Sequence, residues 1–371
     1  MKKRCAILTA FDPSAFKGGI EVYTQQLVNL LQARDVVVDI YHLDRLPGPA
    51  EESGSSTPWR SPFLHKLYRL GRAFYWVDHQ YDFVISHAFF GFGYFPPRIP
   101  AYTIFHSTHA QYAEENRELF SQDWYLEVRS LFGFGAERLS TIGKKVIAVS
   151  ESVADEARTH YAAKLISTAP TGVDRSIFFP RTNRQELREK HAIPQDAFVG
   201  VFLARWDLDK AIDVLEQVIT RTTDVFWLLV LGSGASCPLI GPRLRIVQNV
   251  DREEVAERLS LADFLFHPAR YEGFGLAMVE ALACGLPVIA APVGVMRTVG
   301  QDPLFRSLLL PPYSEGKERA IVAAIHAIDR LRRDNKLRET LRQAGPALVR
   351  ERFDHRRWEM QMLSVLDIAV E

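Results

Sequence analysis

One stretch, residues 261–288 (LADFLFHPARYEGFGLAMVEALACGLPV), constrains the fold of this 371-residue chain more than any other. It opens with an apolar run of strand length, Leu261–Pro268, and the turn Gly273–Gly275 that follows cannot continue as a helix. From Leu276 the apolar residues recur at helical spacing until Gly285 supplies a stop signal. The sequence therefore predicts a strand, a glycine turn and a helix.

The start of this helix is a candidate anion site. A helix start leaves backbone N–H groups unpaired and carries the positive end of the dipole, and glycines let a ligand approach the backbone closely. The candidate binding residues are Gly273, Phe274, Gly275 and Leu276. Glu272 in the turn and Glu280 in the helix add two carboxylates, which suit hydroxyl groups such as those of ribose or a hexose. The alternative is an ordinary strand, turn and helix with solvated glutamates.

The segment YEGFGLAMVEALACGLPV resembles the paired-glutamate signature, Glu, seven residues, Glu, of the retaining glycosyltransferases of family 4. The Gly-Phe-Gly between the carboxylates and the Gly-Leu-Pro-Val after them match as well. The resemblance implies the glycosyltransferase-B (GT-B) fold, an α/β architecture of two Rossmann-like doubly wound domains facing across a cleft. It also implies transfer of a sugar from a nucleotide diphosphate sugar to an acceptor hydroxyl, with retained anomeric configuration.

The first half of the chain alternates apolar strands with helices, which predicts a parallel sheet with ligands at the carboxyl ends of its strands. Gly18 and Gly19 lie in the first loop. They are either a turn that starts the next helix or, as in the resembling family, residues that face the donor diphosphate and the acceptor. His106 follows the predicted strand 101–105 and matches the strand-end histidine that contacts the donor sugar in family 4.

The second half repeats the alternation and places two cations after the predicted strand 197–204. Arg205 and Lys210 can converge on a diphosphate, the arginine as a bidentate fork and the lysine as a point charge. Surface ion pairing is the alternative. The family pattern is Gly-Arg followed by Lys-Gly, and this chain has Ala204 and Ala211 at the two glycines. After the predicted strand 225–231, Gly232 and Gly234 resemble the family's glycine pair near the nucleotide.

The length predicts about two domains. With the resemblance, we expect an acceptor-side domain over 1–178, a donor-side domain over 179–352, and a C-terminal helix within 353–371 that packs back on the first domain.

Residues 61–76 predict a basic amphipathic helix, with Ser61 as N-cap and Pro62 in the first turn. Its basic side carries His65, Lys66, Arg69 and Arg72. The helix is either packed on its domain with a solvated basic face or bound to an anionic membrane surface, and the two readings can coexist.

The amino-acid composition limits the kinds of binding partner and the cell compartment that the sequence suggests. Lys plus Arg and Asp plus Glu are each 45, so no global charge argues for nucleic acid. The scattered cysteines Cys5, Cys237 and Cys284 indicate free thiols in a reducing compartment. The N-terminus has too short an apolar run for a signal peptide or a membrane span. We expect a cytoplasmic protein, peripheral on the inner face of the membrane if residues 61–76 bind lipid.

The predicted site has four catalytic candidates: His106, Arg205, Lys210 and Glu272. Glu280 is assigned to the ribose hydroxyls, and we expect no metal site and no cofactor. The donor is a UDP- or GDP-sugar, and the acceptor a glycan or a lipid-linked glycan in cell-surface glycan or glycolipid assembly. The alternatives are a nucleotide-sugar epimerase or hydrolase of the same fold and a non-catalytic protein that binds sugar nucleotides.

Overall fold

The protein, analysed as a computed structural model, is described over residues 2–14, 19–46, 61–232 and 235–369. It divides into two units: unit 1 is Met1–Pro170 with Glu359–Glu371, and unit 2 is Thr171–Trp358. The sequence placed the boundaries after residues 178 and 352. Backbone hydrogen bonds join Val173 to the end of unit 2, from Val173 N to Phe353 O (2.8 Å) and from His355 N to Val173 O (3.2 Å).

Unit 1 is built on a six-stranded parallel sheet in the order β2-β1-β3-β4-β5-β6. Its strands are β1 Arg4–Leu8, β2 Val37–Tyr41, β3 Phe83–His87, β4 Ala101–Phe105, β5 Lys145–Ala148 and β6 Ile166–Thr168. The strand order reverses between β1 and β3, and ligands of such sheets bind outside the carboxyl ends of the strands at this switch point.

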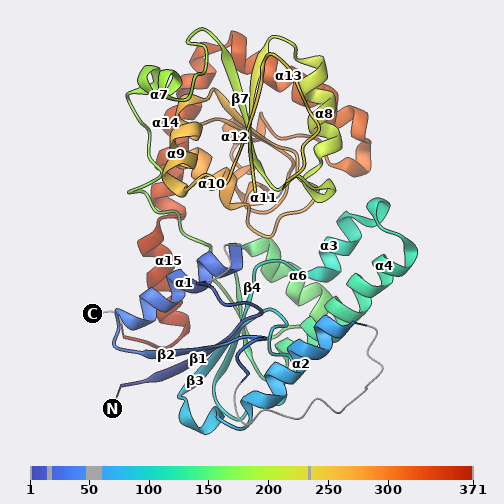
Figure 1. Ribbon diagram of the computed structural model, residues 1–371, viewed down its shortest axis with the longest axis vertical. Helices are drawn as coiled ribbons and strands as arrows, with labels where there is room; N and C mark the ends of the chain where they lie inside the picture. Colours follow the sequence, from blue (N-terminus) through green and yellow to red (C-terminus); the bar gives the residue numbers. More distant parts are fainter. Residues whose placement is uncertain (1, 15–18, 47–60, 233–234, 370–371) are drawn as a thin grey trace. The chain divides into compact units, whose positions relative to one another are not determined.

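Helices cover both faces of this sheet, with α1 and α15 on one side and α2 and α6 on the other (Figure 1). The helices are α1 Gly19–Gln32, α2 Pro62–Phe74, α3 His109–Glu115, α4 Gln122–Leu126, a π-helical stretch Glu127–Glu137, α5 Arg138–Thr141, α6 Glu151–Tyr161 and α15 His355–Val365. The end of the chain is tied to the unit, because Tyr23 Oη donates to Met362 Sδ (3.6 Å) and Lys145 Nζ to Val365 O (3.2 Å).

Unit 2 has a five-stranded parallel sheet in the order β11-β10-β7-β8-β9. Its strands are β7 Phe198–Ala204, β8 Val225–Leu231, β9 Leu244–Gln248, β10 Phe264–His267 and β11 Val288–Ala290. The strand order reverses between β7 and β10, which are hydrogen-bonded neighbours. Trp227, Phe202, Phe264 and Phe266 are fully buried side chains of this sheet. The switch point of unit 2 therefore lies where β7 and β10 end.

The helices of unit 2 also flank their sheet, with α8 and α13 on one side and α9, α10 and α14 on the other (Figure 1). They are α7 Arg184–Lys190, α8 Ile212–Arg221, α9 Arg252–Leu261, α10 Leu276–Ala283, α11 Met296–Val299, α12 Pro303–Arg306, α13 Lys317–Arg333 and α14 Asn335–Arg352. The predicted fold class, two parallel α/β sheets with helices on both faces, is confirmed. The sequence did not predict α14, which contains Pro346.

Helix α2 packs on its unit by its apolar side. Leu64, Leu67, Leu70 and Phe74 are buried, while Lys66 and Arg72 are exposed. Ser61 caps the helix by accepting a hydrogen bond from Leu64 N, as predicted. The packed reading of this helix is confirmed. Over the described residues, no helix combines the length and the apolar character needed to cross a membrane.

Candidate functional site

A buried ion pair joins the two loops at the switch point of unit 2. Lys210, after β7, donates from Nζ to Oε1 of Glu272, after β10, at 2.8 Å. The side chains are 13% and 18% exposed. Because a partly desolvated pair of this kind is costly to break, it fixes both loops against each other. The structure thus brings together two predicted site residues that are 62 positions apart in the sequence.

Two further residues complete this charge cluster. Asp209 Oδ2 lies 3.3 Å from Lys210 Nζ, and His267 Nε2 donates to Glu272 Oε1 at 3.1 Å. Burial alone would lower the pKa of Lys210, but the carboxylates of Glu272 and Asp209 outweigh it and raise that pKa. Burial alone would raise the pKa of Glu272, but Lys210 and His267 outweigh it and hold that pKa far below its usual value. Both groups are therefore charged at neutral pH.

Arg205 stands at the open side of the cluster. It donates to Asp207 (3.2 Å) and Asp209 (3.1 Å), and its side chain remains 64% exposed. A Cβ on Gly232, at the end of β8, would lie 3.7 Å from Arg205 Cγ, so this glycine borders the arginine. Ala211 has φ +53°, the left-handed conformation that the glycine of the family pattern adopts freely. The cations keep their predicted place although both family glycines are alanines.

Asp207-Leu208-Asp209 has the Asp-x-Asp spacing of a metal motif, which the expectation of no metal site overlooked. Both carboxylates are hydrogen-bonded to Arg205, and Asp209 also contacts Lys210. Among the described residues there is no cluster of three His, Cys, Asp or Glu side chains that could hold a metal ion. Asp209 adjoins Lys210 and His267 lies five residues before Glu272, and both were missed because the resemblance pointed to Lys210 and Glu272 instead. Their positions at the ends of β7 and β10 were the available signal.

The glycine turn forms as the sequence predicted. Gly275 precedes α10 with φ +89°, and a Cβ there would collide with the methyl group of Met278. Gly294, with φ +51°, passes so close to the turn that a Cβ would collide with Phe274 O. Val295 N donates to that same oxygen at 2.7 Å. The turn is thus held by its neighbours, and the backbone N–H groups of the first turn of α10, from Leu276 onward, follow it.

Glu280 lies in α10 and has a different partner from Glu272. It is 7% exposed, and Arg252 of α9 donates to its Oε1 at 3.2 Å. Burial raises the pKa of Glu280 to about 7, against the opposing effect of Arg252. No hydrogen bond between described residues joins Glu280 to the Lys210 cluster. Arg252 is a third residue that the sequence did not predict, since no motif around it marks it as a site residue.

In unit 1, His106 belongs to a chain of hydrogen bonds at the switch point of the sheet. Thr24 of α1 donates from Oγ1 to Ile20 O (2.7 Å), and His87, the last residue of β3, contacts Thr24 Oγ1 through Nε2 (2.9 Å). His87 Nδ1 lies 2.9 Å from His106 Nε2. The ring of Tyr23 packs edge-on against His106 with centroids 4.8 Å apart.

The contacts of this chain favour one placement of the protons. With the single hydroxyl proton of Thr24 directed to Ile20 O, His87 donates from Nε2 to Thr24 Oγ1. Burial lowers the pKa of His87 well below its usual value and that of His106 to about 4, so both rings are neutral at pH 7. His87 Nδ1 then accepts, and His106 donates from Nε2. His106 therefore presents Nδ1 as a hydrogen-bond acceptor. His87 and Thr24 were not predicted, although His87 also ends a strand.

Three predicted glycines have limited or no structural description. Gly18 and Gly234 lie outside the described residues. Gly19 begins α1, and a Cβ there would meet no atom within 4 Å. In unit 2 the structure brings together Arg205, Lys210, Glu272, Gly232 and the glycine turn. His106 lies in unit 1.

Comparisons with known proteins agree with this division. Residues 17–177 match the family described as Glycosyltransferase Family 4, and residues 183–347 match Glycosyl transferases group 1. A D-inositol 3-phosphate glycosyltransferase of Xylanimonas cellulosilytica is 33% identical over 188 residues, 45% of each protein. That of Streptomyces bingchenggensis is 26% identical over 329 residues, 77% of this chain and 72% of the relative. The first alignment thus spans less than half of the relative's length.

Solved structures show the same fold. Sucrose-phosphate synthase from Thermosynechococcus elongatus superposes with a TM-score of 0.79 at 23% identity, covering 99% of this chain and 98% of the other. Anabaena HepE in complex with UDP and glucose gives a TM-score of 0.66 at 17% identity, covering 99% and 100%. Together, the two consecutive family matches and the two parallel α/β units show that this chain belongs to the group 1 and family 4 glycosyltransferases of the GT-B fold.

Proposed function

We propose that this chain moves a sugar from a nucleotide diphosphate sugar to an acceptor hydroxyl with retained anomeric configuration. The observation that carries the proposal is the buried Lys210–Glu272 pair with Arg205 beside it, at the switch point of the unit 2 sheet. Ligands of open α/β sheets bind at this point, and paired cations there suit a diphosphate.

The difficult step is departure of the nucleotide, because negative charge grows on the β-phosphate as the sugar carbon becomes positive. Arg205, Lys210 and the N–H groups at the start of α10 would stabilise that charge. Arg205 is suited to move, since its side chain is largely exposed and, among the described residues, its ion pairs are with Asp207 and Asp209. The cation cluster would thus supply electrostatic stabilisation without a metal ion or another cofactor.

The carboxylates take different roles. The lowered pKa of Glu272 keeps it an anion, so it cannot donate a proton to the leaving group. We assign it to the donor sugar, where its charge favours the positive anomeric carbon. Glu280, held by Arg252, is assigned to the ribose hydroxyls. The acceptor attacks from the side that the nucleotide leaves, and the departing phosphate takes its proton.

His106 is assigned to orienting a sugar hydroxyl. Its Nδ1 is a hydrogen-bond acceptor, and a hydroxyl is the matching donor. This assignment follows from the proton positions in the Thr24–His87–His106 chain.

The donor class we propose is a UDP- or GDP-hexose. This proposal is supported by the similarity of the fold to that of HepE, which has been solved in complex with UDP-glucose. The acceptor we propose is a glycan or lipid-linked glycan of cell-surface assembly, used on the cytoplasmic side of the membrane. Helix α2 supports a peripheral position, because Lys66 and Arg72 are exposed on the side opposite its buried leucines.

The test is incubation of the protein with radiolabelled UDP- and GDP-sugars, alone and with a panel of glycan and lipid-linked acceptors. Label that moves to an acceptor with the donor's anomeric configuration, and with the same rate in EDTA, supports the proposal. Conversion of the donor without any acceptor would identify an epimerase or hydrolase instead. Binding without turnover of any donor would identify a non-catalytic sugar-nucleotide protein.

A further inference from the structure

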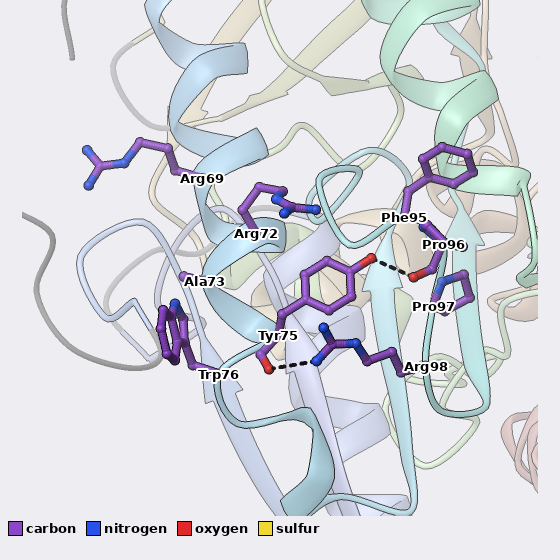
Figure 2. A pocket seen from close by; sticks show the side chains of 9 residues that line it. All are labelled: Arg69, Arg72, Ala73, Tyr75, Trp76, Phe95, Pro96, Pro97 and Arg98. Carbon is purple, nitrogen blue, oxygen red and sulfur yellow. Dashed lines mark hydrogen bonds between the residues drawn. The ribbon is translucent and has the colours of Figure 1, made fainter.

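A second basic pocket lies at the other end of the unit 1 sheet. Figure 2 shows it between the end of α2 and the segment that leads into β4. It has a volume of about 650 Å³, within the usual range of small-molecule sites. Its lining residues are Arg69, Arg72, Ala73, Tyr75, Trp76, Phe95, Pro96, Pro97 and Arg98. The pocket thus combines three guanidinium groups with aromatic and proline walls.

This pocket is separate from the histidine site of the same unit. Arg98 precedes the first residue of β4, and Tyr75 and Trp76 precede β3, so the pocket borders the amino ends of these strands. His87 and His106 lie at their carboxyl ends. Since each strand has five residues, about 16 Å of sheet separates the two ends. A ligand here would not occupy the site at the switch point.

The positive charge of the pocket is only partly neutralised. Arg72 and Arg98 both stack on Tyr75, with their Cζ atoms 4.9 and 4.6 Å from the ring centroid (Figure 2). The buried carboxylate of Asp78 forms a long ion pair with Arg98, 3.8 Å from Oδ2 to Nη1, and also accepts a hydrogen bond from Tyr94 Oη. The guanidinium group of Arg72 has no hydrogen bond or ion pair with any described residue. The Tyr75 ring lies between the two guanidinium groups (Figure 2), and their positive charge favours an anion in the pocket.

The frame of the pocket is rigid. Tyr75 Oη donates to Pro96 O at 2.5 Å and Arg98 Nη1 to Tyr75 O at 3.4 Å, which ties the helix end to the loop (Figure 2). Gly71 and Gly93 let α2 and the loop meet backbone to backbone, because a Cβ on either would collide with the other segment. The arginines therefore project from a fixed surface, which lowers the entropic cost of binding.

The apolar part of the pocket limits the ligand class. Trp76 lies at the edge of the pocket and is 62% exposed. The face of its indole ring can stack on another ring or cover an acyl or prenyl chain. Guanidinium forks match phosphate oxygens in pairs. We infer that this pocket binds a phosphate or diphosphate group carried on an apolar or ring-shaped moiety, either as a free phosphorylated compound or as the headgroup of a lipid. The inference does not rest on the sugar transfer proposed above.

The experiment measures pyrophosphate binding by calorimetry in the Lys210→Ala variant, so that the switch-point site of unit 2 does not compete. Adding Arg72→Gln and Arg98→Gln should weaken binding at least tenfold, whereas adding Arg158→Gln should change it less than twofold. Arg158 is a matched control, since it is also an exposed arginine of unit 1 beside an aspartate. Lysine in place of Arg72 and Arg98 should restore part of the affinity for pyrophosphate. It keeps the positive charge but lacks the two-pronged guanidinium group that contacts two phosphate oxygens. Equal affinity in the Gln variants would overturn the inference.

Flotation with phosphatidylcholine vesicles, with and without phosphatidylglycerol, separates the two sources of the phosphate. If anionic vesicles bind through Arg72 and Arg98 and pyrophosphate displaces them, the ligand is a headgroup. If pyrophosphate binds while vesicle binding ignores these two arginines, the ligand is a free phosphorylated compound. If neither probe depends on them, the pocket is not a phosphate site. Sugar transfer by the wild-type protein is scored separately, so failure of one proposal leaves the other measurable.

Discussion

At the scale of single residues, the Lys210–Glu272 pair decides how the unit 2 site works. A lysine and a glutamate that are each mostly buried must neutralise each other, and the opposite pKa shifts of the two groups express this. The pair holds both groups charged and in place, as the proposed contacts of Lys210 with a diphosphate and of Glu272 with a sugar require.

Breaking this pair should cost stability. Lys210→Met leaves the Glu272 carboxylate buried with only His267 as partner, and should reduce the free energy of unfolding by about 3 kcal/mol. Adding Glu272→Gln should recover most of that loss, because the stranded charge is gone. Urea unfolding at pH 7 of the two single variants and the double variant gives the interaction energy. Additive losses would mean that the two side chains do not stabilise each other.

The histidine chain predicts a pH dependence of stability. His106 has a folded pKa of about 4 against an unfolded value near 6.5, so the unfolded chain takes up its proton first as the pH falls. Stability from this residue is complete above about pH 6.5 and declines toward pH 4. The drop in unfolding free energy from pH 7 to pH 5 should therefore be smaller in His106→Gln than in the wild type.

The protons themselves can be located by ¹⁵N NMR of labelled histidine at pH 7. Both His87 and His106 should carry hydrogen on Nε2 and none on Nδ1. A proton on Nδ1 of either ring would refute the hydrogen-bond directions that make His106 an acceptor.

At the scale of elements, the glycine turn and α10 show what a sequence can predict. The apolar run, the glycines and the helical spacing located β10 and α10 closely, because each feature is local. The partners of the turn were not predictable in this way. Gly294 is 19 residues after Gly275, and only the folded chain brings it against Phe274 O. For the same reason the Arg252–Glu280 and Thr24–His87 contacts were missed, since neither pair is close in sequence.

The close approach of Gly294 to Phe274 O predicts that a small substitution at Gly294 lowers stability. Gly294→Ala puts a Cβ on a residue with φ +51° and against a backbone oxygen, so it should destabilise the fold by about 2 kcal/mol. Gly241→Ala is the matched control, because its Cβ would be 3.8 Å from the nearest side-chain atom, an ordinary contact. Thermal unfolding of the two variants checks this. Equal midpoints would mean that the turn yields without cost.

At the scale of the whole molecule, two parallel α/β sheets carry different chemistry. Unit 2 holds the charge cluster and unit 1 the neutral histidine chain, and each lies at the switch point of its own sheet. Length and the strand–helix alternation were enough to predict two such units, whereas their boundary depended on the pairing of Val173 with Phe353 and His355. That pairing involves residues far apart in the chain and leaves no local pattern.

The measurement that tests the central claim most directly is calorimetric titration of the full chain with UDP and with GDP. One of the two should bind, and Arg205→Gln should weaken it at least tenfold, about 1.4 kcal/mol. Glu280→Gln should weaken it as well, while Arg221→Gln, which removes an arginine paired with Glu318, should leave it unchanged. Failure of both nucleotides to bind, or binding that ignores Arg205 and Glu280, would contradict the placement of the donor at the switch point of unit 2.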